Sequence, residues 1–334
     1  MSILAKIYSK LSYIERTFFE FFHFLKYRPK AKVISIGNLS MGGTGKTPVL
    51  FEILNEFQDQ YPDLKLMVLT RGYRCPWENS FYELYGSCEH PFELTDEALM
   101  LNKRFPKIPV MVGKNRHHAA IIGEMRYQPD IIFLDDGFQY RRLYKDFDFI
   151  LWDAMSTPDE AKPIPDGRLR EPIERLKQAN VILLTRCESA SDKQIEYWQK
   201  WLNEKVPNVP IVKTKTCCEG IFKYDGKPAN LDKNTGLFAF SAIGRPESFY
   251  EQLKQLGYNI ISKKEFRDHH RFSDNELEKL IKEAQSKNLT LVCTEKDAIK
   301  IRPEFAEKMD LNILRIKTIP EQNRFSNFLH LQTN

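Results

Sequence analysis

The chain has 334 residues, 42% hydrophobic and 28% charged, which excludes wholesale disorder and leaves room for about two folded domains. Its 50 basic and 45 acidic residues give a net charge of only +5, which offers no argument for nucleic-acid binding. The six cysteines include no Cys-x-x-Cys pair, so the sequence suggests neither a zinc site nor a disulfide framework, and we expect reduced thiols.

The first predicted element is an amphipathic helix over residues 3–27. No uncharged run approaches the roughly 20 residues that span a bilayer and no signal-peptide cleavage site follows, so we expect neither a transmembrane helix nor a signal peptide. Two interpretations stay open: a core helix packed on the domain, or an interfacial membrane helix, which the frequent aromatic and basic residues favour. Apolar side chains at helical spacing are Leu4, Ile7, Tyr8, Leu11, Ile14, Phe18, Phe21, Phe22 and Leu25.

A glycine-rich loop follows a strand-like run and precedes a helical stretch. Its glycines let backbone N–H groups turn toward phosphates, the ammonium of Lys46 reaches the outer phosphates, and the hydroxyl of Thr47 can bind Mg²⁺. Ser40 stands where the usual pattern has glycine, and we expect Gly42 and Gly43 to supply the lost flexibility. The loop predicts a site for a nucleoside triphosphate. Its residues are Ser40, Met41, Gly42, Gly43, Thr44, Gly45, Lys46 and Thr47.

Beyond this loop, strand-like and helical runs alternate, which predicts a P-loop NTPase-like α/β fold: a doubly wound parallel sheet with the nucleotide at the carboxyl ends of its strands. A Thr- and Lys-rich strand pair at 212–224, with a turn signal at Asp225-Gly226, marks a boundary. We predict an N-terminal helix segment (1–30), a P-loop core domain (31–215) and a smaller α/β domain (216–334) joined by a short β linker. Expected strands are 33–36, 66–70, 108–112, 131–134, 147–152, 181–185, 237–241, 259–262, 289–294 and 311–316; expected helices are 47–57, 96–104, 116–125, 191–202, 246–256 and 274–286.

Three further segments carry acidic or histidine side chains. Asp135 and Asp136 end an apolar run, the form of the second nucleotide motif of P-loop enzymes, in which an aspartate holds Mg²⁺; a pair of turn aspartates is the alternative. Asp96 lies in the first turn of a predicted helix that Thr95 can cap, and capping alone would explain it. The run 268–270, Asp-His-His, suits a metal or acid–base cluster, yet such pairs also occur as solvent-facing loop residues.

Together these segments resemble the tetraacyldisaccharide 4′-kinase family, the lipid A 4′-kinases, over nearly the whole chain. In that family Ser or Thr stands where Ser40 does, so the departure in the glycine-rich loop is a family trait. The segments that carry the resemblance are 36–48, 70–73, 96–97, 135–139, 167–172, 268–270 and 294–297.

The resemblance implies transfer of the γ-phosphate of ATP to the 4′-hydroxyl of tetraacyldisaccharide 1-phosphate, which forms lipid IVA in lipid A biosynthesis. It implies a peripheral enzyme on the cytoplasmic face of the inner membrane, held there by the N-terminal helix, whose partner is the acylated disaccharide 1-phosphate lipid. We expect no nucleic acid and no obligate protein partner.

By the same resemblance, Asp96 is the base that accepts the proton of the sugar hydroxyl. It is assisted by the segment that holds Asp268 and two histidines, of which we favour His269 over His270. Lys46 and the loop amides are expected to bind the phosphates. The expected Mg²⁺ ligands are Thr47, Asp135, Asp136 and Glu171.

Two other classes of function remain as alternatives: a P-loop ATPase or GTPase switch at the membrane surface, and a scaffold that only binds nucleotide. The guanine-specifying Asn-Lys-x-Asp motif is absent and residues 294–297 imitate it only loosely, which keeps GTP formally open. ADP formation that depends on the lipid acceptor separates a kinase from both alternatives.

Overall fold

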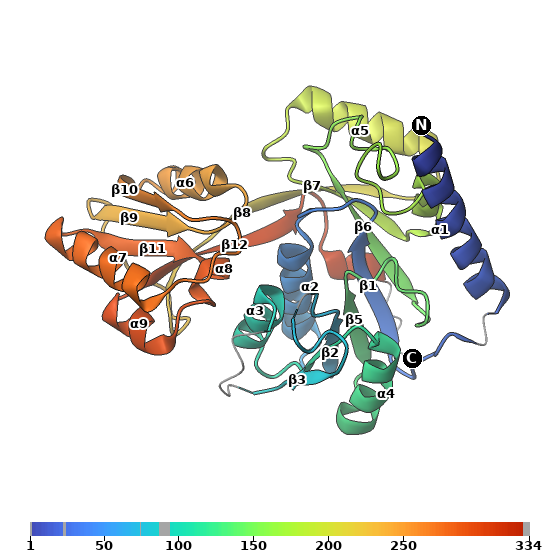
Figure 1. Cartoon of the computed structure of the whole chain (residues 1–334), viewed down its shortest axis with the longest axis horizontal. Helices are drawn as coiled ribbons and strands as arrows, with labels where there is room; N and C mark the ends of the chain where they lie inside the picture. The colour runs from blue at the N-terminus through green and yellow to red at the C-terminus, as the bar shows by residue number, and fades with distance from the viewer. Residues whose placement is uncertain (1, 23–24, 74, 87–93, 330–334) are drawn as a thin grey trace. The chain divides into compact units, whose positions relative to one another are not determined.

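Figure 1 shows a computed structural model of the chain, which describes residues 2–22, 25–73, 75–86 and 94–329. Cys88, expected as a reduced thiol, and residues 23 and 24 of the predicted N-terminal helix lie outside the described residues. The chain forms two compact units: one runs to Thr216 and resumes at Thr318, and the other spans Cys217–Lys317. The second domain expected from the sequence ran to residue 334, whereas the structure returns the chain to the first unit at Thr318.

The first unit is built on a sheet with the strand order β8-β7-β6-β1-β5-β2-β4-β3. Within the described residues, β3 alone runs antiparallel to its neighbour in this sheet. The predicted α/β fold with a doubly wound parallel sheet is confirmed. The strands are β1 (Lys32–Asn38), β2 (Leu66–Thr70), β3 (Tyr82–Leu84), β4 (Val110–Val112), β5 (Ile131–Asp135), β6 (Phe147–Asp153), β7 (Val181–Thr185) and β8 (Ile211–Lys223).

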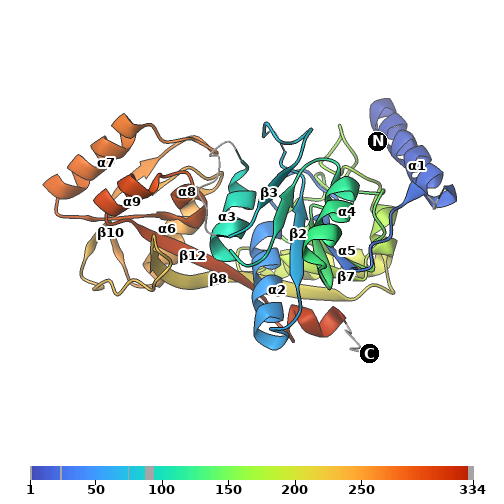
Figure 2. The same cartoon turned by 90° about the horizontal axis from the view of Figure 1, so that it is seen from below.

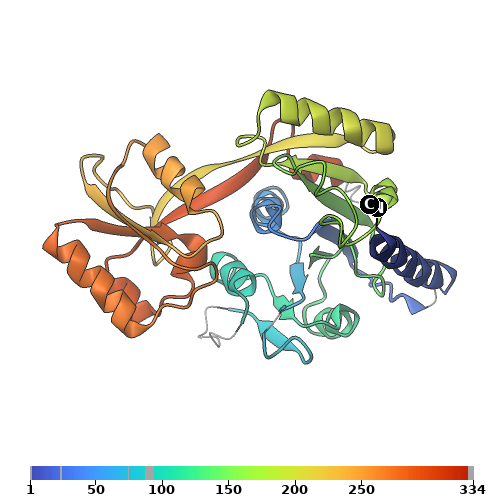
Figure 3. The same ribbon diagram turned by 45° about the horizontal axis from the view of Figure 1, so that its top comes forward.

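Side chains alternate between the two faces along each strand, and apolar side chains are buried on both faces of this sheet. Along β5, Phe133 points into the cluster formed with α2, α3 and η3, while Ile132 and Leu134 point into the cluster formed with α4. On that second face α5 and η2 cover β6 and β7. Figure 2 shows α4 beside β2, and Figure 3 shows that α2 and α5 lie on opposite faces of the sheet. The helices are α2 (Lys46–Gln60), α3 (Asp96–Arg104), α4 (Arg116–Tyr127), η2 (Ile173–Gln178), α5 (Asp192–Lys205) and η3 (Phe325–Leu329).

The returning C-terminal segment is part of the first unit's core. Phe325 is fully buried in the same cluster as α2 and β5. Glu56 of α2 is buried, and its carboxylate accepts hydrogen bonds from the backbone N–H groups of Phe325 (3.1 Å) and Ser326 (2.8 Å). This carboxylate satisfies two donors at the start of η3, so the segment is fixed by polar contacts as well as by packing.

The second unit has the strand order β10-β9-β11-β12-β8. Helix α6 packs on one face of its sheet, and α7 and α9 pack on the other. Both strands that connect the units, β8 and β12, contribute to this sheet. Its elements are β9 (Gly236–Ser241), α6 (Pro246–Gln255), β10 (Asn259–Glu265), α7 (Asp274–Ser286), β11 (Thr290–Thr294), α8 (Glu295–Ala298), α9 (Pro303–Lys308) and β12 (Asn312–Pro320).

The strand pair predicted at 212–224 is wrong. One continuous strand, β8, occupies this stretch. The expected turn at Asp225-Gly226 does form, since the N–H of Gly226 donates to the carbonyl of Lys223 (2.9 Å), but the chain beyond it makes only an isolated bridge. The prediction failed because alternating Thr and Lys residues describe a long connecting strand as well as a hairpin.

Helix α1 (Ile3–Phe21) is shorter than the predicted 3–27. Further along, the backbone N–H of Tyr27 donates to the carbonyl of Arg142, and its carbonyl accepts from the N–H of Tyr144. Tyr27 thus forms a β-bridge with Leu143 and is not helical. Ala5 is buried, whereas Ile7 and Ile14 are 51% and 54% exposed. The apolar side chains of this helix that the structure describes therefore stay largely outside the core, which favours the interfacial interpretation. Among the described helices, none combines the length and apolar character needed to cross a bilayer.

Candidate functional site

The loop between β1 and α2 has the backbone of a phosphate-binding loop. Gly42 (φ 111°) and Gly45 (φ 86°) adopt conformations that side-chain-bearing residues rarely take. Ser40 instead forms a β-bridge with Leu169, so this position does not need glycine. The flexibility expected from Gly42 and Gly43 comes from Gly42 and Gly45, since Gly43 has no positive φ.

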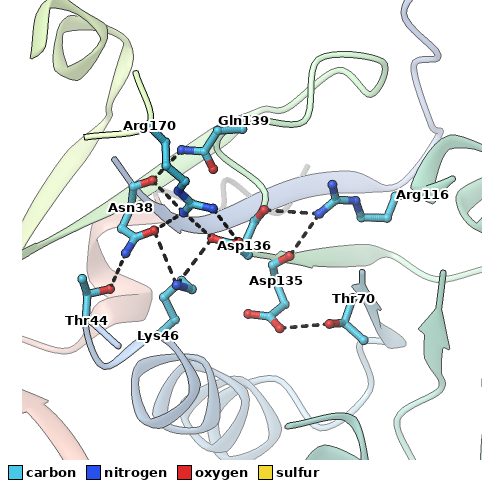
Figure 4. A network of polar contacts seen from close by, with 9 residues as sticks. All are labelled: Asn38, Thr44, Lys46, Thr70, Arg116, Asp135, Asp136, Gln139 and Arg170. Carbon is cyan, nitrogen blue, oxygen red and sulfur yellow. Dashed lines mark hydrogen bonds and ion pairs between the residues drawn. The ribbon is translucent and has the colours of Figure 1, made fainter. Parts of the chain in front are cut away.

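A network of charged side chains surrounds Lys46, the first residue of α2 (Figure 4). Its Nζ lies 3.5 Å from the Oδ1 of Asp136 and 3.4 Å from the Oδ1 of Asn38. Both terminal nitrogens of Arg170 donate to the Asp136 carboxylate (3.1 and 3.0 Å), and one also donates to the Asn38 side chain. Burial would raise the pKa of Asp136, but the hydrogen bond from Arg170 and the charge of Lys46 lower it to about 2. Asp136 is therefore ionised and holds two cations beside the phosphate loop.

Asp135, the last residue of β5, is buried beside this network. Thr70, at the end of β2, donates to its Oδ2 (3.1 Å). Burial, reinforced by the charge of Asp136, raises the pKa of Asp135 to about 6. Carboxylate and hydroxyl oxygens are hard donors that suit Mg²⁺, and such ions in nucleotide sites use one or two protein ligands plus phosphates. Asp135 and Thr47 fit this pattern, whereas both oxygens of Asp136 already accept from Arg170.

The raised pKa of Asp135 predicts a pH dependence of stability. The Asp135 carboxyl has a pKa of about 6 in the folded protein and the ordinary value of 3.8 in the unfolded chain. The folded protein therefore binds the proton more tightly, and the free energy of unfolding falls as the pH rises from about 3.8 to about 6. We expect Asp135→Asn, which keeps an oxygen acceptor for Thr70, to be more stable than the wild type near about pH 8 and nearly equal near about pH 4. Urea unfolding without Mg²⁺ measures both, and an equal difference at the two pH values would contradict the raised pKa.

Among the residues of the site that were not assigned from the sequence are Asn38, Arg116 and Arg170. Arg116 is buried at the start of α4 and donates to the carbonyl oxygens of Asp136 (3.2 Å) and Asp135 (3.5 Å). The available signal was position: Asn38 ends β1, Arg116 begins α4, and Arg170 lies within a segment that carries the resemblance. Such positions at the carboxyl edge of a parallel sheet are where ligands bind.

Glu171 was expected to bind Mg²⁺, and the structure places it between two arginines. One carboxylate oxygen accepts from Arg141 (3.1 Å) and the other from Arg175 (2.6 Å), and all three side chains are buried. Each oxygen keeps a further lone pair, so these bonds leave the expected Mg²⁺ role of Glu171 a prediction.

Asp96 is the first residue of α3, and Thr95 caps the helix by accepting from the N–H of Ala98 (3.3 Å). The charge of Glu97, the next residue, contributes to the raised pKa of Asp135, so Glu97 lies within electrostatic reach of the end of β5. Asp96 belongs to the same unit as the phosphate loop.

The two neighbouring histidines have different environments in the second unit. The ring of His270 stacks on Phe266, and its Nε2 lies 3.1 Å from both carboxylate oxygens of Glu276. His269 is exposed, has φ 60°, and its Nε2 lies 3.2 Å from the Nζ of Lys296. His270 is thereby held by Phe266 and Glu276, and we consider His269 the better candidate to assist the base.

Asp268 is exposed, and its Oδ2 lies 3.2 Å from where a Cβ on Gly244 would be. Asp268 and His269 belong to the second unit and Asp96 to the first. Among the described residues, no group of three or more His, Cys, Asp and Glu side chains is placed to hold a metal ion.

Known proteins resemble the whole chain. The profile of the family described as Tetraacyldisaccharide-1-P 4′-kinase matches residues 1–333. The tetraacyldisaccharide 4′-kinase of Koribacter versatilis is 34% identical, covering 86% of this chain and 86% of that protein. That of Chlorobium limicola is 31% identical, covering 96% and 92%. The fold is similar to the crystal structure of LpxK from Aquifex aeolicus in complex with ATP, with 25% identity, a TM-score of 0.76, and coverage of 96% and 93%.

Proposed function

Because the chain belongs to the tetraacyldisaccharide-1-phosphate 4′-kinase family, we propose that it transfers the γ-phosphate of ATP to the 4′-hydroxyl of tetraacyldisaccharide 1-phosphate, forming lipid IVA in lipid A biosynthesis. The observation that carries this proposal is the placement of the Lys46 loop beside Asp135 and Asp136 in a chain that matches the family over its whole length. The same match favours a kinase over a nucleotide-driven switch.

Phosphoryl transfer depends mainly on positioning and on neutralising charge. Lys46 and the loop amides bind the phosphates, and the Arg170 guanidinium, held by the ionised Asp136, is oriented beside them. Thr47 and Asp135 would hold Mg²⁺, which would offset the negative charge of the phosphates. Asp136 also positions cations, and it and Glu171 already accept hydrogen bonds from arginine.

The acceptor hydroxyl needs a base, and Asp96 is the carboxylate we propose for it. It begins a capped helix whose next residue, Glu97, lies within electrostatic reach of Asp135, which supports a place for Asp96 near the phosphate site. We propose that His269, with Asp268 beside it, assists this carboxylate. The support for that partnership is the resemblance of both motifs to the family, together with the structural pair that already holds His270.

The test of the proposed function is label transfer from γ-labelled ATP with Mg²⁺ to tetraacyldisaccharide 1-phosphate in detergent micelles. The wild type should label the lipid, and Lys46→Ala should lower the rate about 100-fold, because it removes one preorganised charge from the phosphates. If ATP is hydrolysed at a rate that does not depend on the lipid acceptor, and no labelled lipid forms, the result would support a switch and reject the kinase.

We also propose that α1 attaches the enzyme peripherally to an anionic membrane surface, where the acylated substrate lies. Four of its large apolar side chains, Ile3, Ile7, Ile14 and Phe21, are exposed by 77%, 51%, 54% and 75%. Lys6 and Lys10 of the same helix are exposed too and suit an anionic leaflet.

The double substitution Ile7→Ser with Ile14→Ser should weaken binding to vesicles of mixed anionic and zwitterionic phospholipids at least tenfold, since burying one Ile gains about 1.5–3 kcal/mol. Ile261→Ser is the matched control, because Ile261 is 55% exposed on β10. Vesicle co-sedimentation measures both, and equal binding by wild type and the α1 variant would reject α1 as the membrane contact.

A further inference from the structure

The contact between Lys296 and His269 indicates which ring nitrogen of His269 carries the proton. The Nζ of Lys296 lies 3.2 Å from the Nε2 of His269. A lysine ammonium has three N–H donors and no acceptor, so Nε2 can form this hydrogen bond only through its lone pair. In the neutral imidazole the proton then sits on Nδ1.

His270 provides the opposite case one residue away. Its Nε2 faces both oxygens of Glu276, whose pKa is lowered to about 2 by hydrogen bonds from Ser273 and by His270. An ionised carboxylate only accepts hydrogen bonds, so the Nε2 of His270 must carry a proton. The two adjacent histidines therefore differ at Nε2, which accepts a hydrogen bond in His269 and carries a proton in His270.

A single exposed contact of this kind contributes little by itself, but both of its partners are anchored to one buried carboxylate. Asp297 is fully buried, and its Oδ2 accepts from the hydroxyl of Thr294 (2.7 Å) and from the N–H of Ala242 (3.1 Å). The carbonyl of Ala242 in turn accepts from the N–H of His269 (3.2 Å).

The same carboxylate fixes the other side of the contact. Thr294 caps α8, the short helix that carries Lys296 and Asp297. Lys300 completes the shell around Asp297, with its Nζ 3.2 Å from Oδ1. The loop with His269 and the helix with Lys296 are thus tied together through Asp297, which accounts for the segment 294–297 that imitates a guanine-reading motif.

We propose that Lys296 is a positioning residue that holds His269 in its Nδ1–H tautomer, so that His269 offers an N–H donor and not a proton acceptor at Nδ1. A carboxylate base is oriented by such a donor. The value of this tautomer for catalysis rests on the proposed function, but the tautomer itself does not.

Long-range ¹H–¹⁵N spectra of the full chain labelled with ¹⁵N-histidine test this directly, with His269→Gln to assign the signal. We expect an unprotonated Nε2 at His269 and a protonated Nε2 at His270. Lys296→Met should move the His269 proton toward Nε2 and leave His270 unchanged, whereas Lys296→Arg, which also donates, should keep the wild-type pattern. A protonated Nε2 at His269 in the wild type, or no change in Lys296→Met, overturns the proposal.

The kinetic arm uses the kinase assay. Lys296→Met should lower kcat about tenfold without changing the KM for ATP, and Lys296→Arg should restore most of it. Lys279→Met, which removes an exposed charge from α7, is the control for charge loss. Absence of kinase activity in the wild type would refute the proposed function while the spectra still decide the tautomer. Normal kcat in Lys296→Met with the tautomer shifted would reject the positioning role.

Discussion

Asp96→Asn is expected to lower kcat about 100- to 10,000-fold while the affinity for ATP stays within about twofold of the wild type. The amide has the shape of the carboxylate but cannot accept a proton from the sugar hydroxyl. Asp96 occupies the first turn of α3, capped by Thr95, and Asn is well tolerated at helix starts, so the fold should be preserved. Steady-state kinetics and calorimetric ATP binding measure the two quantities separately.

Glu97→Gln is the matched control for Asp96→Asn, because both acids lie in the same helix turn and lose the same charge. It should retain more than about one third of the wild-type kcat, since half-exposed Glu97 is assigned no step of the transfer. A loss of ATP affinity in Asp96→Asn that matches the loss of kcat would show that Asp96 serves the nucleotide and not the acceptor.

Glu171→Ala is expected to lower the free energy of unfolding by about 3–5 kcal/mol, the cost of removing one partner from a buried ion pair. The Glu171 side chain is 2% exposed, and those of Arg141 and Arg175 are 9% and 7% exposed. Without the carboxylate, two largely buried guanidinium groups lose a charged acceptor. Urea unfolding in buffer without Mg²⁺ or nucleotide measures the change.

Glu174→Ala should change the free energy of unfolding by less than about 0.5 kcal/mol, because Glu174 is an exposed acid close in the chain. Glu171→Gln separates the two roles considered for Glu171. Wild-type stability in this variant, combined with a higher Mg²⁺ requirement for turnover, would identify Glu171 as a metal ligand; lost stability with an unchanged Mg²⁺ requirement identifies it as the partner of the two arginines.

The parts of the fold that were predictable from sequence are those with a local cause. Strands such as β2 and β7 are buried on both faces and read as unbroken apolar runs, and α3 and α7 begin at recognisable caps, Thr95 and Ser273. The phosphate loop could be located because its glycines and its Lys-Thr pair lie together in the chain.

The parts that were missed depend on contacts between distant residues. Arg170 reaches Asn38 across 132 positions of sequence, and no periodic pattern marks such a pair. The partners of the acidic side chains could not be predicted for the same reason. Asp136 and Glu171 accept hydrogen bonds from arginine and Asp135 accepts one from Thr70, because the fold places different donors beside each. Sequence identified the residue types of the site, and tertiary structure assigned their partners.

The return of the chain to the first unit at Thr318 makes the second unit an insertion, with consequences for biosynthesis. The loop with Lys46 leaves the ribosome early, but the core beneath α2 stays incomplete until Phe325 has been made. The inserted unit enters and leaves through neighbouring strands, β8 and β12, so its own sheet can close sooner. Completion of the first core therefore waits until the segment around Phe325 has been made, after the whole of the second unit.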